Sequence, residues 1–204
     1  MTEEQYRHFI LNKPYGCLSQ FVNNEKRRKQ RTLLGSLYDF PEKTMAIGRL
    51  DQDSEGLLLL TTNGKVSTLI SSRKIEKEYY VQLDGVIGEE DLEKLRKGVA
   101  ISIQGKRYMT LPAKCDLLIE EPDFAPRSKK VRDDRHGPTS WASITIVEGK
   151  FRQVRKMCSA IGFPVLRLVR VRIGNMRLGN MEVGAVQEVE LFDIEIPPVR
   201  QTED

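Results

Sequence analysis

The chain has 204 residues, of which 39% are hydrophobic and 30% are charged, a balance typical of a globular protein that can bury a core. The formal net charge is +4 and the sequence pI is about 8.9, so any nucleic-acid-binding face must come from local clusters of Lys and Arg. No apolar run approaches about eighteen residues and the N-terminus is acidic, which argues against a membrane span or a signal peptide. The three cysteines are far apart and form no CxxC motif, which favours a reducing, cytoplasmic location over a zinc site or a disulfide framework.

An acidic loop between two apolar segments dominates the first third of the chain. Residues 8–12 and 57–60 are predicted to be buried strands, because each is apolar and is followed by turn residues. Between them, residues 48–56 begin and end with glycine and carry acids on alternate positions, at Asp51, Asp53 and Glu55. The spacing alone leaves two interpretations open. These residues either cap and hydrogen-bond a turn, or they present a carboxylate at the rim of a buried sheet.

The middle of the chain alternates between helical and strand patterns. Helices are predicted at residues 65–72 and 89–97, and strands at residues 77–83, 99–103, 113–119 and 141–147. Residues 121–139 contain three prolines and a cationic run, which predicts a long mobile loop. A second cationic run lies at residues 26–31. Such runs are either solvated loops or phosphate contacts.

A helix with a mixed face is predicted late in the chain. Val154, Met157, Cys158 and Ile161 recur at helical spacing and form one apolar stripe, which ends at a glycine. At about 100° per residue, Arg155 falls at the edge of this stripe, where a half-buried guanidinium must find an acceptor. The same wheel points Arg152 and Lys156 away from the stripe. Strands follow at residues 165–173, with an expected bulge, and at residues 186–191.

Four motifs together carry a family resemblance. They are Lys13-Pro14-Tyr15-Gly16, the loop and strand at residues 48–61, Lys77-Glu78-Tyr79, and Gln153-Val154-Arg155-Lys156-Met157. In this order they resemble the RsuA/RluB/E/F group of pseudouridine synthases, over about residues 8–192. The resemblance implies an α+β pseudouridine synthase fold, with a mixed, mainly antiparallel sheet in two lobes and the active cleft between them.

The resemblance also implies a domain organisation. We expect one catalytic domain over residues 7–196, with approximate lobes at 7–71 and 72–196 and a flexible tail at 197–204. Most relatives carry an S4-like RNA-binding module before the catalytic part. Only a dozen residues precede Lys13 in this sequence, so we expect no N-terminal S4 domain and expect the catalytic body itself to select the RNA.

The activity implied by the resemblance is isomerisation of a specific uridine to pseudouridine in large-subunit (23S) ribosomal RNA, either free or in an assembling large subunit. No cofactor or metal is expected, and we expect a monomer that does not bind membranes. Asp51 matches the catalytic aspartate of the family, whose carboxylate suits either nucleophilic attack or proton abstraction. Tyr79 matches the tyrosine that stacks on the uracil, and Arg155 matches the arginine paired with the aspartate.

Further residues are expected to bind the substrate, and Arg49 resembles a basic residue that some relatives insert into the RNA stack. The predicted substrate-binding set is Arg49, Lys13, Lys77, Arg152, Gln153, Lys156 and Arg170. Two alternatives stay open. The chain could be a noncatalytic RNA-binding or ribosome-assembly factor on the same fold, or a synthase that acts on another RNA, such as small-subunit rRNA or tRNA.

Overall fold

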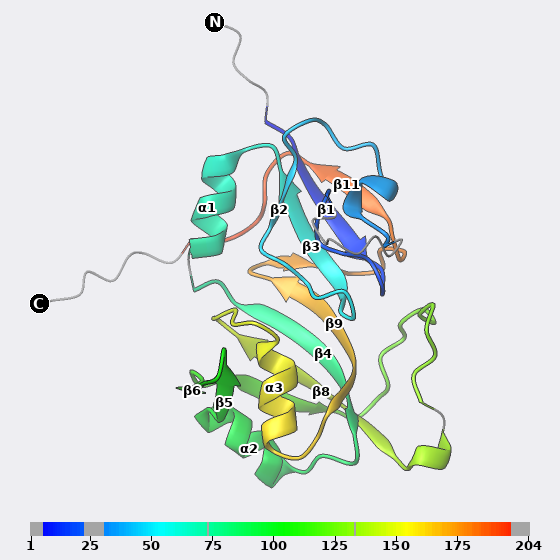
Figure 1. Cartoon of the computed structure of the whole chain (residues 1–204), viewed down its shortest axis with the longest axis vertical. Helices are drawn as coiled ribbons and strands as arrows, with labels where there is room; N and C mark the ends of the chain where they lie inside the picture. Colours follow the sequence, from blue (N-terminus) through cyan, green and yellow to red (C-terminus); the bar gives the residue numbers. More distant parts are fainter. Residues whose placement is uncertain (1–5, 23–30, 73, 133, 197–204) are drawn as a thin grey trace, which may run out of the picture.

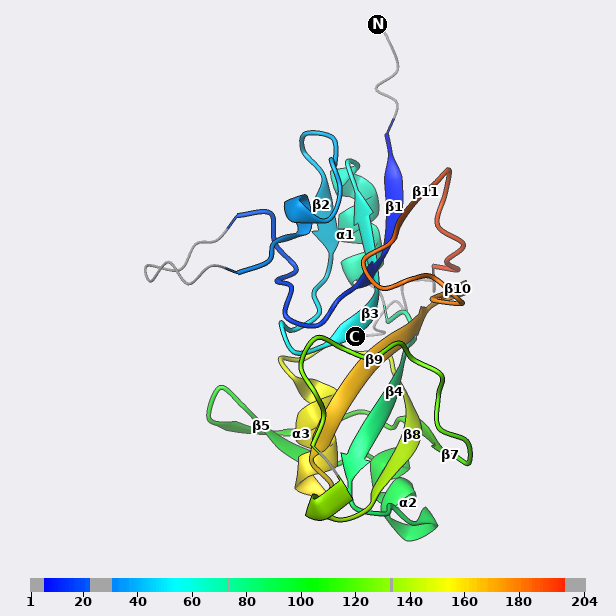
Figure 2. The same ribbon diagram turned by 90° about the vertical axis from the view of Figure 1, so that its right-hand side faces the viewer.

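The computed structural model describes residues 6–22, 31–72, 74–132 and 134–196, which form two lobes joined by one continuous sheet (Figure 1). The upper lobe in Figure 1 contains β1 (His8–Lys13), a 3₁₀ turn (Leu34–Ser36), β2 (Met45–Ile47), β3 (Glu55–Thr61), α1 (Gly64–Ser72) and β11 (Val186–Val189). The lower lobe contains β4 (Lys77–Asp84), α2 (Glu89–Lys97), β5 (Ala100–Ile103), β6 (Lys106–Met109), β7 (Lys114–Leu118), a 3₁₀ turn (Asp134–His136), β8 (Thr139–Ile146) and α3 (Gln153–Ala160). The long strand β9 (Val165–Ile173) spans the junction between the lobes, and β10 (Met176–Arg177) folds back to pair with its end in antiparallel orientation (Figure 2).

The main sheet is mixed and mainly antiparallel, which confirms the predicted α+β fold class. Its strand order is β11-β1-β3-β9-β4-β8-β7, with β2 added to β3, and β5 pairs with β6 in a separate hairpin. The pairing of β3 with β9 is parallel and joins the two lobes. It depends on Gly56, which has a φ of 100° and lies so close to Arg170 that an added Cβ would collide with the backbone there.

The strand β3 explains why residues 57–60 form an uninterrupted apolar run. Leu58 and Leu60 pack into one hydrophobic cluster with Phe9 and Leu34, whereas Leu57 and Leu59 pack into another on the opposite face of the sheet. A strand that is covered on both faces needs no polar alternation. The core thus fixes the position at which the acidic loop emerges from the sheet.

The second core lies beneath α2 and α3 in the lower lobe. Val154, Met157 and Cys158 are buried against the sheet, and Ile161 packs against the same cluster, which confirms the apolar stripe predicted for α3. On the opposite face of this part of the sheet, the Phe124 ring contacts Tyr80 and Trp141. The predicted long loop therefore packs on the sheet over part of its length.

Several details differ from the prediction. The strand β11, which falls in the predicted second lobe, pairs with β1 of the first, so a boundary at residue 72 does not divide the whole chain. The short strands β2, β6 and β10 were not predicted. The expected irregularity of β9 is confirmed by register shifts in its pairing with β4. Most of the cationic run at 26–31 and the tail at 197–204 lie outside the described residues.

In the part of the chain that the structure describes, no helix has both the length and the apolar composition needed to cross a membrane.

Candidate active site

Asp51 lies in a tight turn between β2 and β3. The Ser54 amide donates to the Asp51 carbonyl over 3.0 Å, which closes the turn. A second segment of the upper lobe holds this turn from outside. The Ser19 hydroxyl donates to the Leu50 carbonyl and accepts from the Leu50 amide, at 2.8 and 3.1 Å, and the backbones of Gly16 and Gln52 are joined by a 2.8 Å hydrogen bond. The backbone that carries Asp51 is thus fixed independently of any charged partner.

The Asp51 side chain faces a cavity of about 550 Å³ between the lobes. Its walls include Tyr79 from β4, Leu168 from β9, Arg155 from α3 and Arg152 just before α3. Tyr79 is 8% exposed and lies on the sheet face that α3 covers, with Val81 and Leu83. The structure therefore brings the predicted catalytic residues Asp51, Tyr79 and Arg155 to one cavity, whose size is typical of small-ligand sites.

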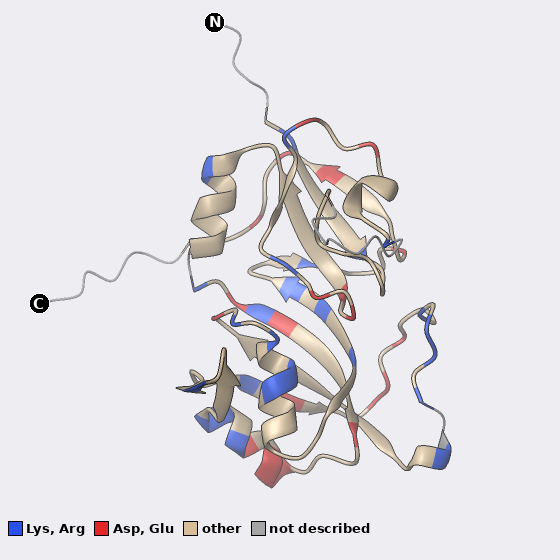
Figure 3. Ribbon diagram, in the orientation of Figure 1, with Lys and Arg blue, Asp and Glu red and all other residues tan. Residues whose placement is uncertain are grey.

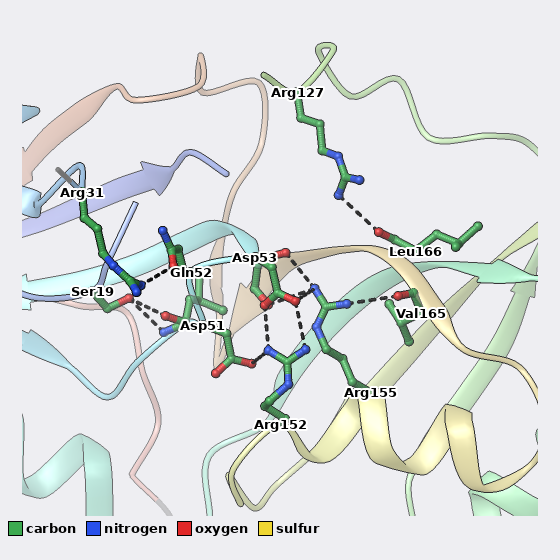
Figure 4. A network of polar contacts seen from close by, with 12 residues as sticks. Ser19, Arg31, Asp51, Gln52, Asp53, Arg127, Arg152, Arg155, Val165 and Leu166 are labelled. Atoms are coloured by element: carbon green, nitrogen blue, oxygen red, sulfur yellow. Dashed lines mark hydrogen bonds and ion pairs between the residues drawn. The ribbon is translucent and has the colours of Figure 1, made fainter. Parts of the chain in front are cut away.

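Arg152 is the ion-pair partner of Asp51, at 3.4 Å, and it also donates both terminal nitrogens to the Asp53 carboxylate at 2.8 and 2.9 Å (Figure 4). The helical wheel placed Arg152 away from the apolar stripe, but the wheel does not apply to this residue. The helix begins at Gln153, and Arg152 precedes it in the left-handed conformation, with a φ of 52°. A residue other than glycine rarely adopts this conformation, which here turns the side chain back into the cleft.

Arg155 reaches inward, as the wheel predicted, but it contacts Asp53 rather than Asp51. Its side chain is 11% exposed. Nη2 donates to the Asp53 carbonyl over 2.7 Å and lies 3.5 Å from the Asp53 carboxylate, whereas Nη1 donates to the Val165 carbonyl over 3.1 Å. The direct Arg155–Asp51 pair expected from the resemblance is thus replaced by a chain of contacts, in which Arg155 and Arg152 share Asp53 and only Arg152 reaches Asp51 (Figure 4).

The two carboxylates of the loop differ in acidity. Burial raises the pKa of Asp51 above its ordinary value, and this effect outweighs the opposing charge of Arg152. Burial also favours a higher pKa for Asp53, but the hydrogen bonds from Arg152 and the charges of Arg155 and Arg152 outweigh it, so the pKa of Asp53 is lowered. Asp53 is therefore the firmly ionised anchor, and Asp51 is the more basic carboxylate, which is better suited to accept a proton or to attack.

The predicted substrate-binding residues fall into different environments. Arg49 is exposed and lines the Asp51 cavity. Lys156 donates to the Ser102 carbonyl over 2.7 Å at the surface. The amide of Gln153 bonds the Lys150 backbone and the Glu148 carboxylate, which favours a role in holding the 148–150 loop rather than in contacting substrate.

Three predicted cations lie deeper in the protein. Lys13 is fully buried, and its ammonium donates to the Pro14 carbonyl over 3.0 Å. It lines a separate cavity that contains neither Asp51 nor Tyr79, so the predicted substrate contact of Lys13 is not supported. Lys77 and Arg170 line a further cavity next to that of Asp51.

Some residues of the site carried no recognisable sequence signal. Ser19 and Gln52 act through backbone contacts that join distant parts of the chain, and Arg31 donates to the Gln52 side chain over 2.6 Å. Phe151 is 67% exposed at the rim of the Asp51 cavity. An aromatic residue between Lys150 and Arg152 is the one feature of this group that the sequence could have singled out, because rings among cations are typical of surfaces that stack on bases.

The fold and the site define a class of protein. A family model described as RNA pseudouridylate synthase matches residues 7–160, and the chain belongs to this family. It is 45% identical over 186 residues to ribosomal large subunit pseudouridine synthase E of Vibrio parahaemolyticus, across 89% of this chain and 73% of the relative. It is 43% identical over 168 residues to the protein of the same name from Xanthomonas axonopodis pv. citri, across 81% and 85% of the two chains. Among solved structures, a crystal structure of a pseudouridylate synthase matches with a TM-score of 0.71 at 28% identity, across 93% of this chain and 72% of the other.

Proposed function

We propose that this protein is a pseudouridine synthase that isomerises one specific uridine of large-subunit ribosomal RNA. The observation that carries the proposal is the half-buried Asp51 carboxylate, which shares a cavity with the Tyr79 ring and with guanidinium groups in a member of the pseudouridylate synthase family. The large-subunit RNA target is supported by the names of the relatives that are 43–45% identical to this chain.

The chemistry needs a group that acts at the glycosidic bond. The bond between N1 of uracil and C1′ of the sugar breaks, the uracil turns, and a bond forms between C5 and C1′. C5 then loses its proton and N1 gains one, so that the product is an isomer of the substrate. Asp51 acts on the nucleotide as a nucleophile or as a general base, and both roles need the ionised carboxylate. Tyr79 offers a flat ring against which the detached uracil is held until it recombines.

The two arginines serve Asp51 in different ways. Arg152 favours the ionised form of Asp51 through its charge at 3.4 Å, whereas Arg155 acts on the Asp51 turn through the Asp53 carbonyl. Both arginines come from the lower lobe and both aspartates from the upper lobe (Figure 4). This network joins the two lobes at the position of the Asp51 carboxylate.

We also propose that the protein acts as a monomer in the cytoplasm. The three buried free cysteines suit a reducing compartment. Light scattering on the purified protein tests the first statement, and a dimer at working concentration would contradict it.

The function is tested by mapping pseudouridines in ribosomal RNA from cells that lack this protein. We expect one large-subunit site to be lost and to return when the wild-type chain is expressed. It should not return with Asp51→Asn at equal protein level. A complete set of large-subunit pseudouridines in the deleted cells would contradict the proposal. If the lost pseudouridine lies in small-subunit rRNA or tRNA, that RNA is the substrate of the enzyme.

If Asp51→Asn restored the modification, the chain would be acting without this carboxylate, as a ribosome-assembly factor that lets another enzyme reach its site.

A further inference from the structure

A second cavity of about 320 Å³ adjoins the Asp51 cavity along the same face of the sheet. Tyr79 lines both cavities. On β9, Leu168 lines the first cavity, and Arg170, two residues further along, lines the second. Because side chains two residues apart on a strand share a face, the cavities follow one another along the sheet, with Tyr79 between them.

Arg170 carries a buried charge that no carboxylate balances. The residue is 3% exposed. Its Nε donates to the Leu57 carbonyl over 2.7 Å, whereas Nη2 is buried without a hydrogen-bond partner. Within the described residues, no ion pair forms at this guanidinium, in contrast to Arg167 and Arg172 of the same strand, which each pair with a glutamate. A buried guanidinium without a counter-charge is costly, so it indicates a place where a ligand supplies the charge.

Lys77 adds a second unbalanced cation on the neighbouring strand. Its ammonium donates to the Ile75 carbonyl over 2.8 Å, and burial together with the charge of Arg170 lowers the pKa of Lys77 to about 8. Figure 3 shows the blue segments of β4 and β9 side by side where the lobes meet. Lys74 and Arg49 add exposed cations to the lining of this cavity.

The acidic residue of this cavity does not balance these charges. Glu148 lines it, but one of its carboxylate oxygens accepts from the Tyr108 hydroxyl, and the other accepts from the Leu111 amide and the Gln153 side chain. Its hydrogen-bonding capacity is directed to β6, to the segment that follows β6 and to the first residue of α3. The second cavity is therefore a cationic site with open anion-binding capacity.

We propose that the cavity lined by Lys77 and Arg170 binds one backbone phosphate of the substrate RNA, at a linkage next to the uridine that enters the Asp51 cavity. This inference rests on the proposed function, because RNA in the first cavity brings a phosphodiester to the second. A phosphate at this point fixes the register of the RNA, since it sets which nucleotide can reach Asp51. Base contacts elsewhere then select the sequence.

The test combines one protein variant with one change in the RNA. The RNA is a large-subunit fragment that contains the mapped uridine, with a single uncharged methylphosphonate placed in turn at each linkage around it. The variant is Lys77→Met, which removes the charge and keeps the apolar stem. Its control is Lys97→Gln on α2, where the lysine pairs with Glu93 and lines neither cavity.

With the unmodified RNA, we expect Lys77→Met to weaken binding about tenfold and to reduce the salt dependence by about one phosphate contact. One methylphosphonate next to the uridine should weaken binding to the wild-type protein by a similar factor and should have little further effect on Lys77→Met. Lys97→Gln should bind as the wild-type protein does. Additive losses at every linkage, or equal losses in Lys77→Met and Lys97→Gln, would overturn the proposal.

The two proposals fail in different ways. Wild-type protein that binds the fragment but forms no pseudouridine would overturn the proposed function, and the coupling of Lys77 to one linkage could still be measured from binding alone. Pseudouridine formation without that coupling would leave the function intact and overturn the phosphate site. Competition by inorganic phosphate that depends on Lys77, without any linkage effect, would mark a free-anion site and would also overturn it.

Discussion

The two neighbouring cavities of this protein differ in whether their charged side chains have partners of opposite charge. In the first, Asp51 and Asp53 face Arg152 and Arg155, so that acids and guanidinium groups are matched. In the second, Arg170 and Lys77 face each other without a carboxylate partner in the described part of the chain. Matched charges hold groups in fixed orientations for chemistry, whereas unmatched cations retain their binding capacity for a charged ligand. One continuous sheet face thus carries a reacting site and a binding site.

The largest effect should come from the more basic carboxylate of the matched cavity. We expect Asp51→Asn to reduce the rate of pseudouridine formation by about 10³-fold or more. The folded protein should be little affected, because Asp51 makes one contact of 3.4 Å and its backbone is held by Ser19. Single-turnover assays and thermal unfolding measure the two quantities.

Asp53→Asn is the matched control for this prediction, because Asp53 lies two residues after Asp51 in the same loop. It removes the anchor of both arginines, so we expect a loss of about tenfold to a hundredfold, together with lower stability. If Asp53→Asn abolished turnover and Asp51→Asn did not, the roles of the two acids would have to be exchanged.

The next largest effect concerns the paired hydrogen bonds from the Arg152 guanidinium to Asp53. Arg152→Lys keeps a positive charge but cannot donate two parallel hydrogen bonds to Asp53. We expect kcat to fall about tenfold with little change in KM, because the variant loosens the orientation of Asp51 rather than RNA binding.

Lys156→Gln is the comparison, since this cation contacts the Ser102 carbonyl outside the network. It should chiefly weaken RNA binding and flatten its salt dependence. An equal loss of kcat in the two variants would show that the paired hydrogen bonds from Arg152 have no special role in positioning Asp51.

The matched cavity also predicts a pH dependence. Burial raises the pKa of Asp51, so as the pH falls the carboxylate accepts its proton, and activity declines, at a higher pH than for an exposed aspartate. Because the charge of Arg152 opposes this shift, Arg152→Gln should move the acid limb of the kcat profile to still higher pH. Single-turnover rates from about pH 8 down to about pH 4 test this. If the acid limb of the kcat profile were unchanged in Arg152→Gln, Asp51 would not be the group whose titration limits activity.

The sequence predicted the parts of the structure that depend on a local apolar pattern. The helix at residues 89–97 was predicted with its observed bounds, since its apolar pattern determines it. The strand at residues 165–173 was also predicted with its observed bounds, although its apolar and basic residues do not alternate cleanly. The inward position of Arg155 followed from the apolar pattern of its own helix. The position of Arg152 did not, because helical geometry does not apply to a left-handed residue before the helix begins.

Contacts between distant parts of the chain were also beyond the sequence. Ser19 contacts Leu50 across 31 positions, and β11 returns to pair with β1 from the other end of the chain. Lys13 is buried at the end of β1, which lies between β11 and β3 in the sheet, a position that a Lys-Pro dipeptide alone does not indicate. Local patterns therefore predicted the elements, and tertiary packing decided which cations face a cavity.

The smallest expected effect concerns the unmatched cavity in the absence of RNA. A partly buried cation without a counter-charge destabilises the folded state, so Lys77→Met should raise the free energy of unfolding by about 1 kcal/mol at neutral pH. The pKa of Lys77 is lowered to about 8 in the folded protein, from its ordinary value of 10.5. Between these values the unfolded chain binds more protons than the folded one, so the stability of the wild-type protein rises with pH and the advantage of Lys77→Met declines.

Below about pH 8 the penalty is fully present, and the gain from Lys77→Met should be constant there. Lys13 also has a pKa lowered to about 8, but it is common to both proteins and cancels in the difference. Urea unfolding of the two proteins on both sides of pH 8 measures this difference. If Lys77→Met is more stable without RNA and binds RNA more weakly, the charge of Lys77 lowers the stability of the folded protein and increases its affinity for RNA. A loss of stability would instead assign the ammonium a structural role at the Ile75 carbonyl, and the contrast between the two cavities would not hold.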